Sequence, residues 1–213
     1  MNTQNKSVFA ERLTPGNAVI AMIDHQTGLL LSCRDQDVHL TKANIRGLCS
    51  MAKTLDLPSV ITASMPQGPN GPIMPDILEL LGNNVIERSG EINAWDNTDF
   101  KGAIEATGRK KIIMAGVVTD VCLMFPAISA VADGYDVYAV VDASGTWNET
   151  VRNAAMMRMT QAGVKVTTWA AVLAELMHDW RSEKGMELGG VLGEHTSYQW
   201  VYDSFLAAQP NSK

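Results

Sequence analysis

Cysteine is scarce in this chain, with three residues, Cys33, Cys49 and Cys122, in a total of 213. An odd number of cysteines without close spacing argues against a disulfide framework, and it provides no Cys-x-x-Cys motif for a metal or a redox centre. We therefore expect three reduced thiols.

Long apolar runs and excess positive charge are also missing. No stretch approaches the roughly 20 apolar residues that span a bilayer, so we expect no integral membrane protein and no membrane partner. The net charge is −6, which gives no basic surface for nucleic acid, and we expect none to bind. The N-terminal residues lack the charged-then-apolar pattern of a signal peptide, which favours a cytoplasmic location.

What is present fits one globular domain over residues 1–213. The composition is 46% hydrophobic and 19% charged, and a chain of this length buries roughly 70% of its unfolded surface without disulfides or metals. Residues 181–213 differ from the rest, since they combine weak periodicity with clustered glycines and aromatic residues. We expect this C-terminal tail to pack on a neighbouring subunit, because leaving it exposed would be costly.

Apolar runs of strand length alternate with segments of helical spacing. Six strands are predicted, at residues 18–23, 59–63, 84–86, 111–118, 136–141 and 164–168. Five helices are predicted between them, at residues 42–55, 75–81, 100–107, 121–133 and 150–162. Strands that alternate with helices and are apolar on both faces form covered parallel sheets. The pattern therefore predicts a three-layer α/β/α fold with a central six-stranded parallel sheet.

Polar residues close these apolar runs, at Asp24, Ser64, Arg88, residues 119–122 and Asp142. In parallel α/β sheets, ligands bind outside the carboxyl ends of the strands. We therefore expect these residues to lie along one edge of the sheet.

Cys122 lies in the turn between the fourth predicted strand and the helix after it. Unpaired N–H groups and the positive end of a helix dipole at such a turn favour the thiolate, which is the nucleophilic form of cysteine. The position therefore suggests a reactive cysteine. The alternative is a small, inert core residue, which is the commoner state of a free cysteine.

Five segments, taken in order, carry a resemblance to a known family. They are residues 23–30 (IDHQTGLL), 68–72 (GPNGP), 92–97 (INAWDN), 116–122 (GVVTDVC) and 142–146 (DASGT). With these segments the chain resembles the isochorismatase-like cysteine hydrolases, which include nicotinamidases and N-carbamoyl amidases, and it is most similar to their YcaC-type branch. The match runs from about residue 17 to about residue 180.

The resemblance implies a catalytic triad of Asp24, Arg88 and Cys122. Its implied chemistry is a thioester that forms on Cys122 and is then hydrolysed, with Asp24 taking the thiol proton and returning it to the leaving amine. Where the family usually has lysine, this chain has Arg88. A guanidinium is permanently charged, so it can hold a carboxylate and stabilise a thiolate but cannot shuttle protons.

The resemblance also implies the surroundings of the triad. The backbone N–H groups of Val118 and Cys122 are expected to form an oxyanion hole, and the peptide bond between Val117 and Val118 is expected to be cis. No metal or other cofactor is expected, because the four histidines lack the Asp-x-His cluster of metal-using nicotinamidases.

Four further residues are candidates for contact with a small carbonyl substrate: Gln26, Asn93, Trp95 and Trp147. An amide and an aromatic ring near a basic residue suit such a substrate. For Asn93 and Trp95, packing of the loop is an equally good interpretation.

The sequence therefore favours a hydrolase of the isochorismatase-like type that cleaves a C–N bond in a small amide or related carbonyl compound. By resemblance to the YcaC-type branch, it is expected to form a homo-octamer. The alternative is a non-catalytic or redox-sensing oligomeric thiol protein on the same fold. A nucleotide-binding α/β domain is disfavoured, because no glycine-rich phosphate-binding motif follows any predicted strand.

Overall fold

The computed structural model describes residues 11–209 and contains one six-stranded parallel sheet, in the order β3-β2-β1-β4-β5-β6. The strands are β1 Ala18–Ile23, β2 Ser59–Ser64, β3 Val85–Arg88, β4 Lys111–Gly116, β5 Asp136–Val140 and β6 Lys165–Thr167. All six predicted strands are present with ends shifted by at most two residues, and the predicted α/β class is confirmed. The outer limits of the expected domain, residues 1–10 and 210–213, lie outside the described residues.

Nine α-helices connect and extend the sheet within residues 11–209. They are α1 Thr27–Ser32, α2 Val38–Thr54, α3 Pro75–Leu81, α4 Thr98–Ala106, α5 Met124–Ala132, α6 Glu149–Gln161, α7 Trp169–Met177, α8 Gly185–His195 and α9 Tyr198–Ala208. Short 3₁₀ turns lie at η2 Ala94–Asp96 and η4 Val141–Ala143, and a π-helical turn lies at η3 Thr119–Leu123. The five predicted helices are confirmed, whereas α1, α7, α8 and α9 were not predicted.

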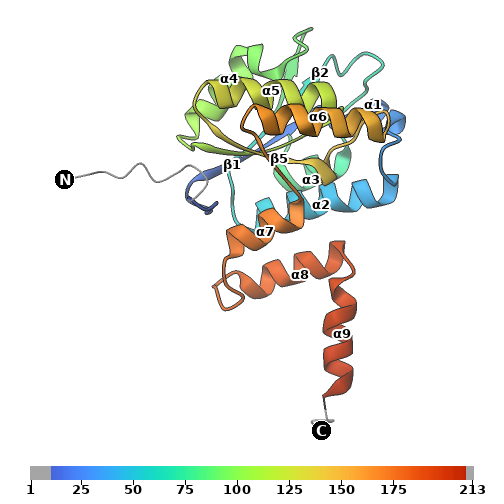
Figure 1. Ribbon diagram of the computed structural model, residues 1–213, viewed down its shortest axis with the longest axis vertical. Coiled ribbons are helices and arrows are strands. Elements are labelled where there is room, and N and C mark those ends of the chain that lie inside the picture. The colour runs from blue at the N-terminus through green and yellow to red at the C-terminus, as the bar shows by residue number, and fades with distance from the viewer. Residues whose placement is uncertain (1–10, 210–213) are drawn as a thin grey trace, which may run out of the picture.

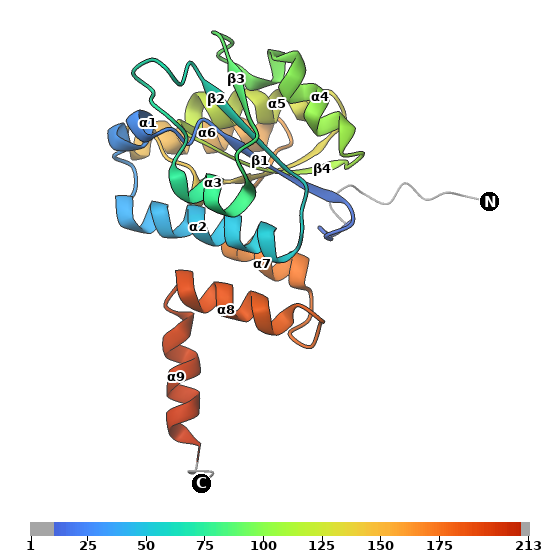
Figure 2. The same cartoon turned by 180° about the vertical axis from the view of Figure 1, so that it is seen from behind.

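Helices cover both faces of the sheet. Helices α2, α3 and α7 lie on one face and α4, α5 and α6 on the other (Figures 1 and 2). The sequence of β1 is continuously apolar because the strand is buried on both faces. Ile20 and Met22 belong to the core on the α2 side, while Val19 and Ala21 belong to the core on the α5 side. Buried strands of this kind are typical of covered parallel sheets.

The strand order places a topological switch point between β1 and β4. From these two central neighbours the chain builds outward, to β2 and β3 on one side and to β5 and β6 on the other. Ligands of open α/β sheets bind at such a point, outside the carboxyl ends of the strands. Asp24 follows β1 and Cys122 follows β4, so both lie at this position.

The described part of the C-terminal tail, residues 181–209, contains two helices that lie differently on the body, and its packing on a neighbouring subunit stays a prediction. Helix α8 packs on α2 of its own chain, and Leu188 is fully buried in the core on that side. Helix α9 extends away from the body, and none of its residues is buried (Figures 1 and 2). In residues 11–209 no helix is long and apolar enough to cross a membrane.

Candidate active site

Asp24 is the first residue after β1, and its side chain is only 1% exposed. Its backbone has φ of 55°, in the left-handed region that aspartate enters more readily than most residues. The backbone leaves the line of the strand at this residue. Both carboxylate oxygens accept hydrogen bonds from Nη2 of Arg88, which forms a buried ion pair.

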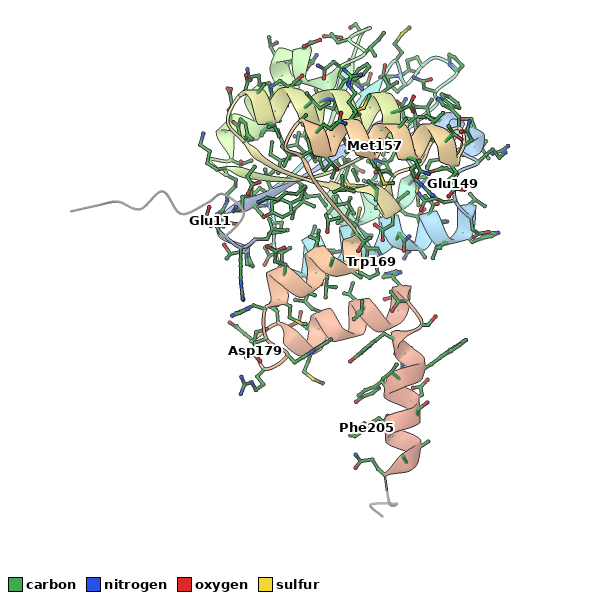
Figure 3. All side chains as sticks on the ribbon, viewed as in Figure 1. Glu11, Glu149, Met157, Trp169, Asp179 and Phe205 are labelled. Atoms are coloured by element: carbon green, nitrogen blue, oxygen red, sulfur yellow. The ribbon has the colours of Figure 1, made fainter. Side chains whose placement is uncertain are left out.

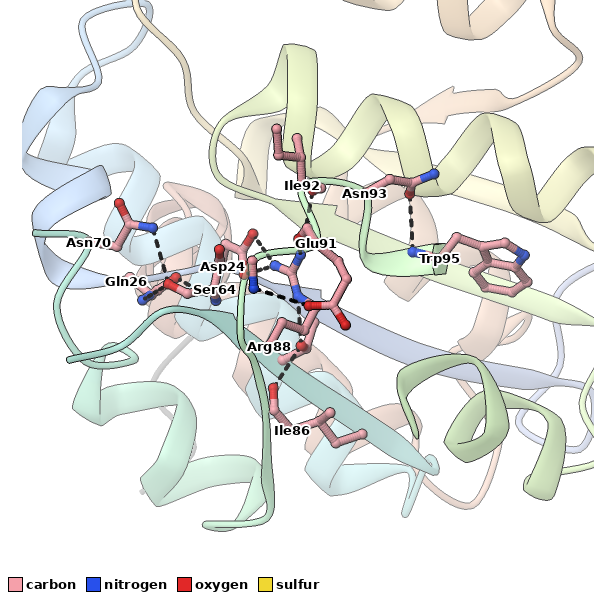
Figure 4. A network of polar contacts seen from close by, with 12 residues as sticks. Asp24, Gln26, Ser64, Asn70, Ile86, Arg88, Glu91, Ile92, Asn93 and Trp95 are labelled. Carbon is pink, nitrogen blue, oxygen red and sulfur yellow. Dashed lines mark hydrogen bonds and ion pairs between the residues drawn. The ribbon is translucent and has the colours of Figure 1, made fainter. Parts of the chain in front are cut away.

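Arg88 ends β3, two strands away from β1, and its buried side chain reaches Asp24 across β2 (Figure 4). Its Nε donates to Oγ1 of Thr62 at 3.1 Å, and its Nη1 donates to the carbonyls of Glu91 and Ile92. All three guanidinium nitrogens are therefore engaged, which fixes the orientation of Arg88. Sequence reasoning missed Thr62, although a hydroxyl in the middle of an apolar strand was a usable signal.

Cys122 lies in the π-helical turn η3 directly after β4 and is partly buried. The Asp24 carboxylate and the Val118 N–H both act on its thiol, the first raising and the second lowering the pKa of Cys122. Asp24 therefore links the three residues expected to form a triad, since it pairs with Arg88 and its charge acts on Cys122.

The protonation state of Cys122 differs from the expected thiolate. Burial, followed by the charge of Asp24 and its hydrogen bond, raises the pKa of Cys122 well above its ordinary value. The Val118 N–H and the charge of Arg88 act in the opposite direction but are outweighed. The expectation of a resting thiolate is wrong, because the nearest charged group is a carboxylate and the sulfur has lost most of its water. The resting residue is a thiol beside the Asp24 carboxylate.

The expected oxyanion hole is present only in part. The peptide bond between Val117 and Val118 is cis, as expected, and the Val118 N–H faces the Cys122 sulfur. The N–H of Cys122, however, donates to the carbonyl of Val118 at 2.8 Å inside the π turn. This second donor is therefore already used, and the Val118 N–H is the donor available beside the sulfur.

His25 lies next to Asp24 but faces elsewhere. Its Nε2 donates to the carbonyl of Ala143 at 2.9 Å, and burial lowers the pKa of His25 to about 4. Histidine is therefore neutral here at pH 7 and is a structural neighbour of the triad.

Three of the four candidate substrate residues, Gln26, Asn93 and Trp95, are hydrogen-bonded to other parts of the protein. Gln26 is fully buried, and its amide donates to the carbonyls of Ser64 and Gly71 and accepts from the Ser64 N–H. Asn93 accepts from the Trp95 N–H, which fixes the loop that they share.

The ring of Trp95 points away from Arg88 (Figure 4) and donates to Asp133 at 2.8 Å. The structure therefore favours the loop-packing interpretation for Asn93 and Trp95. Trp147, with 43% of its surface exposed, is the member of the set with an open ring.

The loop at residues 68–72 folds onto the start of α1, beside Gln26. The N–H of Thr27 donates to Pro72 O and that of Gly28 to Asn70 O, each at 2.9 Å. A Cβ at Gly28 would lie 2.2 Å from Pro69 O, so a glycine is required for this close approach. Two of the sequence segments that carried the resemblance thus form one wall next to Asp24.

Among residues 11–209 no group of three or more histidine, cysteine, aspartate or glutamate side chains is placed to hold a metal ion. The site consists instead of a guanidinium paired with a carboxylate whose charge acts on one thiol, an arrangement that suits nucleophilic chemistry with a positioned base.

This geometry agrees with the comparisons to known proteins. The family model for the isochorismatase domain matches residues 17–171, and the chain belongs to the isochorismatase family of hydrolases. It is similar to "Probable hydrolase YcaC" of Escherichia coli strain K12, with 46% identity over 173 residues that cover 81% of this chain and 83% of the relative.

Two solved structures are similar throughout. YcaC from Pseudomonas aeruginosa has 45% identity and a TM-score of 0.88, and the match covers 92% of this chain and 98% of that one. YcaC from Escherichia coli has 42% identity and a TM-score of 0.88, over 93% of this chain and 98% of that one. The resemblance drawn from the sequence is confirmed by these matches.

Proposed function

We propose that this protein is a cysteine hydrolase that cleaves a C–N bond in a small amide or related carbonyl compound through a thioester on Cys122. The observation that carries the proposal is the position of Asp24 at the switch point of the sheet, where its carboxylate accepts from the Arg88 guanidinium and its charge acts on the Cys122 thiol.

Each step of the reaction has a group in place. As the Cys122 sulfur attacks the carbonyl carbon, its proton passes to the neighbouring Asp24 carboxylate. The oxyanion is stabilised by the N–H of Val118. Protonated Asp24 then gives the proton to the leaving nitrogen, which leaves a thioester. A water molecule, deprotonated by Asp24, hydrolyses this thioester and releases the acid and the thiol.

Arg88 acts by charge and by position. It holds the carboxylate in one orientation and lies close enough to the sulfur to lower its pKa, although it cannot donate or accept the transferred proton. The general-base role therefore falls on Asp24 alone.

The similar structures support a small amide substrate. YcaC from Pseudomonas aeruginosa is described with hexane-2,5-diol and covalent acrylamide, a small amide, and YcaC from Escherichia coli is described as an octameric hydrolase of unknown specificity. In this chain Cys122 is the nucleophile placed beside a base.

We also propose a homo-octameric assembly in which α9 packs on a neighbouring subunit. Helix α9 carries a set of exposed apolar side chains: Trp200, Val201, Tyr202, Phe205 and Leu206. Phe205 stands clear of the body of its own chain (Figure 3). Apolar patches of this kind mark protein interfaces.

The chemistry is tested by labelling with acrylamide. Intact-mass spectra with limiting reagent should show one fast adduct, mapped to Cys122 and lost in Cys122→Ser. Cys49 is buried, the thiol of Cys33 donates to Leu29 O, and neither has the Asp24 carboxylate beside it, so Cys33→Ser and Cys49→Ser should label like the wild type. Equal labelling of all three cysteines would contradict the assignment.

Turnover is tested by screening a panel of small amides for ammonia release. A slow substrate should also give a transient acyl adduct on Cys122 in rapid-quench mass spectra. Oxidation of Cys122 by peroxide without any acyl adduct across the panel would favour the thiol-sensor alternative instead.

A further inference from the structure

A short segment after β5, residues 143–146, runs along the turn that carries the nucleophile; we call it the strap. Within it, Ser144 Oγ accepts from the N–H of Gly116 at 3.1 Å, and the carbonyl of Gly145 accepts from the N–H of Thr119 at 2.9 Å. The strap therefore bonds to the nucleophile turn on both sides of its cis peptide.

A third bond comes from a side chain that the proposed reaction does not use. Thr146 Oγ1 donates to Oδ1 of Asp120 at 2.6 Å, two residues before Cys122. The Thr146 side chain is fully buried. A hydroxyl that donates to a carboxylate makes a stronger bond than a neutral pair does.

The strap is also tied to the segments that flank the general base. His25, directly after Asp24, donates to Ala143 O at 2.9 Å. Beyond α1, Asp35 Oδ1 accepts from the N–H of Thr146 at 2.8 Å, and Gln36 donates to Ser144 O at 2.7 Å. The strap, residues 143–146, thus contacts the turn that carries Cys122. It also contacts both ends of segment 24–36, which begins at Asp24.

There is little room for the strap to move. A Cβ on Gly145 would lie 2.9 Å from the Cys33 sulfur and 3.3 Å from its Cβ, which is closer than real Cβ contacts. Cys33 therefore packs directly against Gly145, whose carbonyl accepts the hydrogen bond from the Thr119 N–H.

From these contacts we propose that the strap sets the distance between the Cys122 thiol and Asp24, and that Thr146 is a positioning residue that acts through Asp120. The proposal rests on the proposed roles of Cys122 and Asp24. The two groups follow different strands, and for proton transfer they must be held in reacting geometry, where a shift of 1 Å costs up to about a hundredfold in rate.

The test is the rate of Cys122 alkylation by acrylamide as a function of pH. Thr146→Val removes the donor and keeps the shape, and it should slow alkylation at neutral pH by about tenfold, which is part of the cost expected from misplacement. Thr146→Ser restores the hydroxyl and should recover most of the rate. Thr160→Val is the matched control, because Thr160 Oγ1 bonds only within α6, to Met156 O.

A second pair of variants uses the packing against Gly145. Gly145→Ala should slow alkylation, and the addition of Cys33→Ala should restore it, because the closest clash is with the Cys33 sulfur. If Thr146→Val does not fold, Gly145→Ala with and without Cys33→Ala tests the positioning role of the strap instead. Each variant is first compared with the wild type by circular dichroism and thermal unfolding.

Folded Thr146→Val and Gly145→Ala proteins that react at the wild-type rate and pH profile, even with a lower melting temperature, would overturn the proposal, since the strap would then be purely structural. A failure of the proposed function gives a different result: no amide in the panel is hydrolysed, while the strap variants still slow alkylation of Cys122.

Discussion

Asp24 controls the chemistry of its neighbours at the scale of single residues. Its charge raises the pKa of the Cys122 thiol, and in the proposed reaction its oxygens also accept the thiol proton. In that reaction Cys122 is therefore kept as a thiol and is activated by proton transfer during attack. Arg88, fixed by Thr62 and two backbone carbonyls, keeps that acceptor in place.

Asp24→Asn should separate these two effects. Loss of the carboxylate lowers the pKa of Cys122, so labelling by iodoacetamide should extend to lower pH. Turnover of any amide found in the screen should nevertheless fall by about 100-fold or more, because the base is gone. An asparagine variant with near-normal turnover would assign the base role elsewhere. Thermal unfolding is the necessary control, because an unpaired buried Arg88 costs about 3–5 kcal/mol.

His25 predicts a pH dependence of stability. Its pKa is lowered from 6.5 to about 4 by burial, so between these values the unfolded chain binds more protons than the folded one. Stability should therefore fall as the pH drops through this window, by about 2 kcal/mol from this residue at pH 5 relative to neutral pH. Urea unfolding at pH 7 and pH 5 measures the loss.

The comparison for His25 is His25→Gln, which keeps a donor for Ala143 O and does not titrate. Its stability should change less between the two pH values than that of the wild type. The exposed His39→Gln protein serves as control and should behave like the wild type. An equal loss of stability in His25→Gln would assign the pH dependence to other groups.

At the scale of elements, the π turn η3 determines how the nucleophile is presented. The carbonyl of Val118 accepts from Val121, Cys122 and Leu123, which widens the turn. Gly116 allows the turn to fold back, since a Cβ there would lie 3.0 Å from the N–H nitrogen of Leu123. Pro126 has no N–H for the carbonyl of residue 122, and the regular helix α5 begins only at Met124.

Helix α9 is the element whose role depends on other chains. Deletion of residues 198–213 should leave the fold intact, because α9 contributes no buried residue, but it should reduce the mass measured by light scattering. An octamer of 23.1 kDa chains has a mass of about 185 kDa. Trp200→Ser in the full-length chain is the milder variant and should weaken the assembly in the same direction.

Two outcomes would count against α9 as an assembly element. A full-length protein that runs as a 23.1 kDa monomer at micromolar concentration would refute the assembly. A truncated protein that keeps the full-length assembly would place the subunit contacts on other surfaces.

At the scale of the whole molecule, the order of the strands in the sheet brings the residues of the candidate site together. Asp24, Arg88 and Cys122 are separated by 64 and 34 positions in the sequence, and they meet because β1 and β4 are neighbours at the switch point while Arg88 reaches across β2. Their place at strand ends could be predicted, because polar residues that close apolar runs are visible in the sequence. Helix α7 could have been predicted too, since its buried residues follow helical spacing: Trp169, Val172, Leu173, Leu176 and Met177.

The sequence by itself determined the fold class and the strand ends, because hydrophobic periodicity reports burial directly, and its resemblance to the family suggested the three residues that are proposed as a triad. The tertiary structure decided the protonation of Cys122, since a pKa depends on which charge is nearest and on how much water has been removed. It also decided that Gln26 and Trp95 bond within the protein. Hydrogen-bond partners that lie far apart in the chain depend on three-dimensional packing that local sequence does not encode. The division of the tail between α8 and α9 depends on the same packing.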